Sequence, residues 1–182
     1  MSKLDSNSVD KAIEKYLHKI ILNKTQYSRV ISAVDNLKQL LSGDEDGLLP
    51  LDLKIYLQGS FITRTAMQPR IEVNESAEYD ADLVLESTQW DIANPESALE
   101  AIYHTLLDSR YPDESIEMKP SCVRIHYADG PKGEKFHVDV VPILSYGGNQ
   151  FVASCKEDGH SWEPSNPSKL SNRFNSMATT YP

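Results

Sequence analysis

The sequence predicts an α/β (α+β) fold in which a mixed β-sheet is flanked by helices. Apolar residues recur at helical spacing near the amino terminus, and later apolar runs alternate at the period of a strand. The 182 residues, 40% of them hydrophobic and 25% charged, suit one compact domain. These three observations fix the fold class before any motif is considered.

Two amphipathic helices are predicted first. Apolar residues repeat every three or four positions over residues 9–21 and again over residues 27–41. Ser8 and Thr25 are the expected N-caps, and Ser42-Gly43 is expected to end the second helix.

Strands are expected near residues 53–58, 79–86, 121–127 and 134–142. A further helix is expected from about residue 95 to 109, with Asn94 as its cap and Pro95 in its first turn. Helices and strands therefore mix along the chain, without an internal repeat or a low-complexity segment.

The carboxyl end differs in composition. Pro, Ser, Asn and Thr dominate residues 161–182, which are expected to form a loop with one helix near 167–178. We therefore divide the chain into a folded domain at 1–160 and a polar tail at 161–182. The tail is too poor in apolar residues for us to expect it to wall a ligand pocket.

Three aspartates stand out on the predicted strands. Asp80 and Asp82 share one face of their strand because successive side chains alternate, and Asp139 adds a carboxylate from another strand. Crowded carboxylates are unfavourable unless a cation compensates them. Hard oxygen ligands suit Mg²⁺ or Mn²⁺, and two such ions activate a hydroxyl and neutralise a leaving pyrophosphate. Asp80, Asp82 and Asp139 are therefore the predicted catalytic metal ligands, for two ions.

A Gly-Ser pair precedes the aspartates. If the chain turns at Gly59 from a strand into a short helix, the backbone NH groups and the Ser60 hydroxyl face a triphosphate. Most Gly-Ser pairs are ordinary turns, and most lone Asp-x-Asp patterns lie on solvated strand edges. The combination of all three features in this order favours a nucleotidyl-transfer site.

Other candidates are weaker. Arg64 and Lys169 are candidate phosphate contacts, although solvated surface side chains explain both equally well or better. His137 shares a face with Asp139 by strand parity, as a supporting or a structural residue. Trp162 and Tyr146 either stack on a base or anchor the core.

Several motifs carry a family resemblance. They are Gln58-Gly59-Ser60-Phe61 with Arg64-Thr65 and Pro69, then Tyr79-Asp80-Ala81-Asp82-Leu83, His137-Val138-Asp139-Val140-Val141-Pro142, and Ser161-Trp162-Glu163-Pro164. Together they resemble the polymerase-β-type nucleotidyltransferases, and within them the cGAS/DncV-like (CD-NTase) enzymes related to oligoadenylate synthases.

The resemblance implies a polymerase-β-type nucleotidyltransferase fold. Residues 1–160 would be the catalytic domain with N-terminal helices, and 161–182 the start of a missing helical domain, so that residues 1–182 alone would make little product. The implied activity is synthesis of a cyclic or short linear oligonucleotide messenger from nucleoside triphosphates, in bacterial anti-phage signalling through a downstream effector. Two alternatives stay open: transfer of one nucleotide to a tRNA, protein or small acceptor, and an inactive nucleotide-binding regulatory module.

Composition indicates which binding partners and which cellular compartment to expect. A net charge of -9 argues against a nonspecific grip on nucleic acid, which depends on many Lys and Arg contacts to phosphates. Cys122 and Cys155 show neither a zinc-ribbon nor a disulfide pattern. No apolar run approaches the ~20 residues that span a bilayer, so we expect a cytoplasmic protein.

Overall fold

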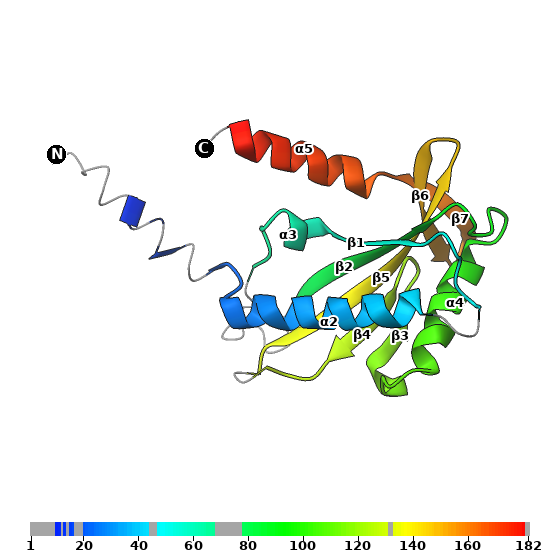
Figure 1. The fold of residues 1–182 in the computed structure, drawn as a ribbon, viewed down its shortest axis with the longest axis horizontal. Coiled ribbons are helices and arrows are strands. Elements are labelled where there is room, and N and C mark those ends of the chain that lie inside the picture. Colours follow the sequence, from blue (N-terminus) through cyan, green and yellow to red (C-terminus); the bar gives the residue numbers. More distant parts are fainter. Residues whose placement is uncertain are drawn as a thin grey trace.

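The computed structural model describes residues 10, 11, 13, 15, 16, 20–43, 47–67, 78–130 and 133–180. Its elements are α2 (Lys24–Ser42), β1 (Lys54–Gln58), α3 (Gly59–Ile62), β2 (Glu78–Ser87), α4 (Pro95–Leu107), the 3-10 helix η1 (Asp113–Ser115), β3 (Ile116–Met118), β4 (Val123–Tyr127), β5 (Lys135–Tyr146), β6 (Asn149–Lys156), β7 (Gly159–Ser165) and α5 (Pro167–Thr180). The predicted α/β fold, a mixed sheet flanked by helices, is confirmed (Figure 1).

The sheet is built around two long central strands. Its order is β1-β2-β5-β4-β3, with β2 and β5 parallel and the remaining neighbours antiparallel. The last part of β5 also pairs with β6, and β6 pairs with β7, so a hairpin extends the sheet at that end. The parallel pair places the carboxylates of two distant sequence segments on adjacent strands.

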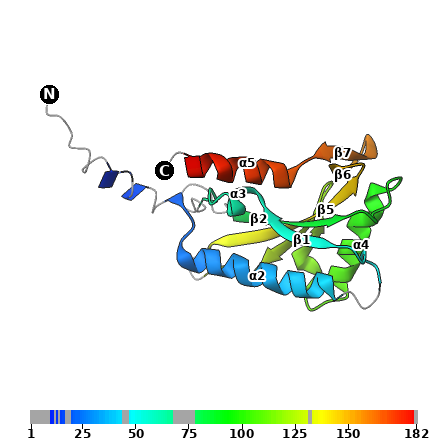
Figure 2. The same cartoon turned by 45° about the horizontal axis from the view of Figure 1, so that its top comes forward.

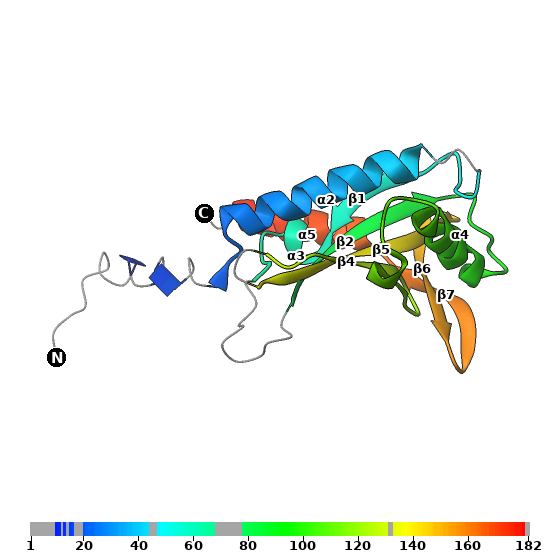
Figure 3. The same cartoon turned by 90° about the horizontal axis from the view of Figure 1, so that it is seen from below.

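The two faces of the sheet have opposite character. Tyr79, Ala81, Leu83 and Leu85 alternate along β2 and are all buried on one face. Helices α2 and α4 cover that face, as Figure 3 shows. The side chains of α2 and α4 in this core are Val30, Ala33, Val34, Leu37, Leu41, Ala98, Leu99, Ile102 and Leu106. The residues between them on β2 point to the other face, which carries the charged groups.

Helix α2 begins earlier than the sequence analysis proposed. Asn23, not Thr25, is the N-cap: its side chain accepts from the Gln26 backbone NH, and the Gln26 side chain accepts from the Asn23 NH. This reciprocal pair satisfies two donors that a single threonine would not. The helix ends at Ser42, with Gly43 as its C-cap, as predicted.

Other helix predictions have mixed outcomes. Helix α4 starts with Pro95 after Asn94, as expected, although the Asn94 side chain makes no capping hydrogen bond. Helix α5 matches the helix predicted near 167–178. Residues 9, 12, 14 and 17–19 of the first predicted helix, its cap Ser8, and Pro69 lie outside the described residues.

The chain between the predicted sheet and α5 forms more structure than expected. Residues 159–165 form β7, where a loop was predicted from residue 161, and β3 and β6 were not predicted. Strand β7 is mostly exposed, so no apolar alternation marks it. Backbone pairing with β6 holds it, together with Trp162, whose Nε1 donates to the Asp91 carbonyl at 2.9 Å. Trp162 is thus an anchor of the hairpin.

Both cysteines are free thiols. Burial, and then the charge of Asp139, raise the pKa of the Cys122 thiol to about 12, so this sulfur is protonated at neutral pH. None of the helices in the described parts of the chain has the length and apolarity needed to cross a membrane.

Candidate active site

A row of polar side chains runs across the charged face of the sheet. In register, Gln58 on β1 pairs with Asp82 on β2, Asp82 with Asp139 on β5, and Asp139 with Arg124 on β4. Adjacent strands are ~4.8 Å apart, so the two aspartates are direct neighbours. Asp80 lies two positions earlier on β2. The structure therefore brings the three predicted aspartates together on one face.

Arg124 holds the third aspartate. Its Nε and Nη2 donate to the two carboxylate oxygens of Asp139 at 2.8 and 2.9 Å, and the Asp139 side chain is only 13% exposed. A planar bidentate pair of this kind fixes the orientation of a carboxylate. The sequence analysis did not single out Arg124. Strand parity, which places Cys122, Arg124 and His126 on one face, was the available signal.

Asp82 is in a different electrostatic position. Burial, followed by the negative charges of Asp80 and Asp139, raises its pKa to about 6, and the positive charges of His137 and Arg124 only partly oppose this. The negative charge of the three neighbouring carboxylates therefore exceeds the positive charge that His137 and Arg124 bring near them. A donor set of three carboxylates with a net deficit of positive charge fits a divalent cation bound by oxygen ligands.

Gly59 packs directly against Asp82. Its φ of +71° lies in the left-handed region, and a Cβ at this position would stand 2.3 Å from Asp82 Oδ2. Only glycine fits this backbone and this close approach. The short helix α3 starts at Gly59, as predicted, so the Gly-Ser turn and the aspartates form one site.

A pocket of about 510 Å³ opens beside this site. On one side it is lined by Gly59, Ser60 and Asp82, and on the other by Leu170 and Phe174 of α5. Figure 2 shows α5 above α3 and β1, on the opposite side of the sheet from α2. The expectation that residues 161–182 contribute no wall is wrong, because two apolar side chains spaced i, i+4 share one face of this polar helix.

Volume alone does not identify the site. A larger hollow of about 650 Å³ lies along α2, next to Tyr127 and Phe136. None of the described residues that line it carries a carboxylate, and it lies on the face of the sheet opposite to Asp80, Asp82 and Asp139. The chemistry of the lining favours the pocket beside Asp82.

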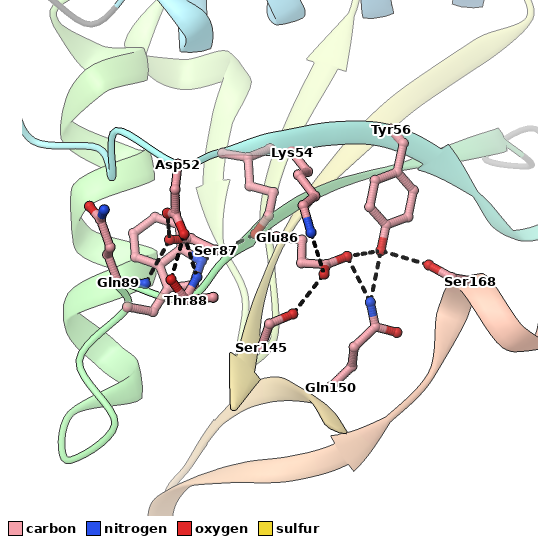
Figure 4. Close-up of polar contacts among 12 residues, drawn as sticks. Asp52, Lys54, Tyr56, Glu86, Ser87, Thr88, Gln89, Ser145, Gln150 and Ser168 are labelled. Carbon is pink, nitrogen blue, oxygen red and sulfur yellow. Dashed lines mark hydrogen bonds and ion pairs between the residues drawn. The ribbon is translucent and has the colours of Figure 1, made fainter. Parts of the chain in front are cut away.

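A partly buried hydrogen-bond cluster around Glu86 ties the base of α5 to the sheet (Figure 4). Ser168 Oγ donates to Tyr56 Oη at 3.1 Å, and Tyr56 Oη donates to Glu86 Oε2 at 2.8 Å. Ser145 Oγ and Gln150 Nε2 donate to Glu86 at 2.6 and 2.7 Å. The wall of the pocket is thereby linked to β1, β2, β5 and β6.

The two basic candidates lie apart from the pocket. Arg64 is exposed in the turn after α3, with a positive φ of 57°, and lines a separate small hollow with Tyr27 and Phe61. Lys169 is exposed in the first turn of α5, where its backbone NH donates to Asn166 Oδ1 at 2.8 Å. Their roles in phosphate binding stay predictions.

Comparison with known proteins gives a consistent family. A family model described as "Second Messenger Oligonucleotide or Dinucleotide Synthetase domain" matches residues 8–177. A curated relative from Roseivirga ehrenbergii, named c-di-GMP synthase, is 27% identical over 153 residues, which cover 80% of this chain and 37% of that protein. The chain thus spans little more than a third of the length of this relative.

Solved structures share the fold. The CD-NTase CdnG of Bradyrhizobium diazoefficiens, in complex with GTP, superposes with a TM-score of 0.68 at 19% identity, over 85% of this chain and 43% of that one. Vibrio cholerae DncV, a cyclic AMP-GMP synthase, gives 0.59 at 15% identity, over 90% of this chain and 58% of that one. Capnocytophaga granulosa CdnE, a c-di-GMP synthase, gives 0.59 at 17% identity, over 87% and 48%.

Proposed function

Since the chain belongs to the family of Second Messenger Oligonucleotide or Dinucleotide Synthetase domains, we propose that it joins nucleoside triphosphates into a cyclic or short linear oligonucleotide. One observation carries the proposal: Asp82 lies between Asp139 on the neighbouring strand and Gly59 at the mouth of a nucleotide-sized pocket. A carboxylate cluster joined to an open pocket suits a reaction of phosphates that needs divalent cations.

The aspartates have distinct roles in this proposal. Asp80 and Asp82 would hold the cations, and Asp139, oriented by Arg124, would be a further ligand. When bound, Mg²⁺ or Mn²⁺ supplies the positive charge that lowers the pKa of the attacking hydroxyl and neutralises the leaving pyrophosphate. The raised pKa of Asp82 supports this assignment. Burial and the neighbouring carboxylates disfavour the ionised form of Asp82, and a bound cation would offset both effects.

The pocket positions the donor nucleotide. Ser60 and Thr63 line it on the α3 side, where the Ser60 hydroxyl can donate to a phosphate chain. Leu170 and Phe174 line it on the α5 side and offer an apolar surface to a base. Holding the donor against the aspartates supplies the orientation on which nucleotidyl transfer depends. Arg64 and Lys169 would add positive charge at the edge of the pocket only if their side chains turn toward a bound substrate.

The cellular role is part of the same proposal. The product would act as a second messenger in anti-phage defence, made in the cytoplasm and recognised by a downstream effector. The relatives named c-di-GMP synthase and cyclic AMP-GMP synthase support a purine nucleotide product.

The decisive experiment is product analysis. Purified protein is incubated with the four labelled nucleoside triphosphates and Mg²⁺, as residues 1–182 and as any longer natural form, and the products are identified by mass. A cyclic or linear oligonucleotide is expected, in small amounts from residues 1–182. A nucleotide attached to an added tRNA, protein or small acceptor, or nucleotide binding without any product, would replace the proposal with one of the two alternatives.

One variant tests the division of roles. Asp139→Ala should lower turnover much more than nucleotide affinity, because Asp80 and Asp82 still hold a cation with the triphosphate. Initial rates and equilibrium titration measure the two quantities. Equal losses in both would refute the separate role of Asp139.

A further inference from the structure

A second group of ligands lies on the charged face, next to the aspartates. In register, Asp80 on β2 pairs with His137 on β5, and His137 pairs with His126 on β4. Glu78 precedes Asp80 by two positions and therefore points to the same face of β2. Three strands thus bring one carboxylate and two imidazoles together, and the proposed nucleotidyl transfer uses none of them.

The ligand atoms converge. Glu78 Oε2 lies 2.7 Å from His137 Nδ1 and 3.9 Å from His126 Nδ1. One ligand atom from each of the three residues lies within 4.8 Å of the others. Two nitrogens and one oxygen at such separations are close to the arrangement around a single ion with bond lengths of ~2.0–2.2 Å.

The outer nitrogens of both imidazoles also face carboxylates. His126 Nε2 lies 3.5 Å from Glu117 Oε2, and His137 Nε2 lies 4.0 Å from Asp139 Oδ1. Metal-binding histidines usually direct their second nitrogen to a carboxylate or carbonyl, which fixes the tautomer and orients the ring. Glu117 is such a partner for His126, whereas Asp139 lies near the far nitrogen of His137 without a hydrogen bond to it.

We propose that Glu78, His126 and His137 bind one first-row transition-metal ion, with Zn²⁺ as the best match. Two imidazoles and one carboxylate suit zinc, whereas Mg²⁺ prefers oxygen ligands alone. Three protein ligands leave a coordination position for water. Glu117 and Asp139 supply further negative charge around the dication.

The site adjoins the aspartates and is distinct from them. Its ligands come from positions 78, 126 and 137, whereas the cation pair of the proposed transfer uses Asp80, Asp82 and Asp139. His137 connects the two, since its Nε2 faces Asp139. A zinc ion on Nδ1 would fix this ring beside Asp139, so we expect zinc occupancy to stabilise the sheet.

Metal titration tests the site without any nucleotide. Protein cleared of metal with a chelator is titrated with Co²⁺, whose visible absorption reports its coordination, and then with Zn²⁺ as competitor. One equivalent of Co²⁺ should bind and be displaced by Zn²⁺. His126→Ala should weaken binding by at least about 100-fold, and Glu117→Gln by about 10-fold, the range typical of an outer partner.

Two control variants sharpen the result. His160 Nδ1 lies 3.0 Å from Glu96 Oε2 in an exposed pair of the same chemistry, for which the described residues offer no third ligand, so His160→Ala should leave binding unchanged. Asp82→Asn should also leave it unchanged, which separates this site from the cation pair. Circular dichroism confirms that each variant is folded.

The opposite results are equally clear. Absence of a stoichiometric cobalt signal would overturn the proposal and leave Glu78 and His137 as a hydrogen-bonded pair. Binding that survives in His126→Ala, for example through Cys155, would also overturn it. Because the readout is metal binding, failure here leaves the nucleotidyl-transfer proposal intact, and failure of that proposal leaves this one intact.

Discussion

Asp82 and Glu86 lie four residues apart on the same face of β2, and their pKa values shift in opposite directions. Burial tends to raise the pKa of Glu86, but hydrogen bonds from Ser145 and Tyr56 outweigh it, so the pKa lies below its usual value. Burial raises the pKa of Asp82 to about 6, with the charge of Asp80 adding to it.

The opposite pKa shifts distinguish a structural carboxylate, Glu86, from a candidate functional one, Asp82, on the same strand. Donors from three other strands and the base of α5 converge on the Glu86 cluster, which makes this carboxylate part of the scaffold. Asp82 has carboxylates for neighbours and an open pocket beside it. A group kept in an unfavourable environment by the fold is a candidate for chemistry. The following experiments test this contrast.

The largest effect should come from the aspartate pair. Asp80→Asn combined with Asp82→Asn removes the proposed cation ligands without opening a cavity, so turnover should fall by at least about 10³-fold while the protein stays folded. Pyrophosphate release and thermal melting measure the two properties. Turnover at the parent rate would show that Asp82 is no more functional than Glu86.

Next in size is the effect of a single methyl group at the Gly-Ser turn. In Gly59→Ala the new Cβ would meet Asp82 Oδ2, so the carboxylate must move, and misplacement by about 1 Å can cost ~10²-fold in rate. Gly148→Ala is the matched control: Gly148 has a similar φ of +77°, and no atom of the described residues lies within 4 Å of its Cβ position. Equal rate losses in both variants would contradict a specific contact with Asp82.

Glu86→Ala should instead affect stability. It leaves the partly buried donors of Ser145, Tyr56 and Gln150 without their acceptor, at an expected cost of about 2–4 kcal/mol in the free energy of unfolding. Lys54→Ala should cost no more than ~0.5 kcal/mol, because this partner is 72% exposed and 3.6 Å from Glu86. Urea denaturation measures both, and a neutral Glu86→Ala would remove Glu86 from the scaffold.

The smallest effect is a pH-dependent gain in stability. In metal-free protein, Asp82 has a pKa of about 6 against 3.8 for the free group, so the native state binds the proton more tightly. Folding stability is therefore lost as the pH rises from about 4 to above 6, at up to about 2–3 kcal/mol. Asp82→Asn avoids this loss and should be the more stable protein at about pH 7 but not at about pH 4.

Denaturation of both proteins at the two pH values, with a chelator present, measures this difference. A gain that is equal at both values would mean that the asparagine stabilises for another reason. Added Mg²⁺ should stabilise the parent protein alone.

Local patterns predicted much of the sheet and the core of the site. Strand alternation placed Asp80 and Asp82 on one face, and an apolar run placed Asp139 on another strand. Strand β7 escaped detection because pairing with β6 and the single anchor Trp162 hold it, so no apolar alternation marks it. Its polar composition resembles that of a loop.

Contacts between segments that are distant along the chain could not be predicted from the sequence. Arg124 becomes a partner of Asp139 only through the register of β4 with β5, and a register shift by one residue would turn it to the other face. The link from Ser168 to Tyr56 spans 112 positions. Asn23, in contrast, was missed although Asn23 and Gln26 have the spacing of a capping box, which the sequence alone shows.

The attachment of α5 has a mechanical consequence. Its hydrogen bond from Ser168 to Tyr56 lies near one end of a 14-residue helix, which extends about 20 Å at 1.5 Å per residue. The helix is thus a lever with its pivot at the Glu86 cluster. A tilt of about 10° at the pivot would move Phe174 by roughly 1.5 Å and the far end by about 3–4 Å. The orientation of α5 at the Glu86 cluster therefore determines the width of the pocket. Substitutions around Glu86 could change which base fits, although these residues do not contact the nucleotide.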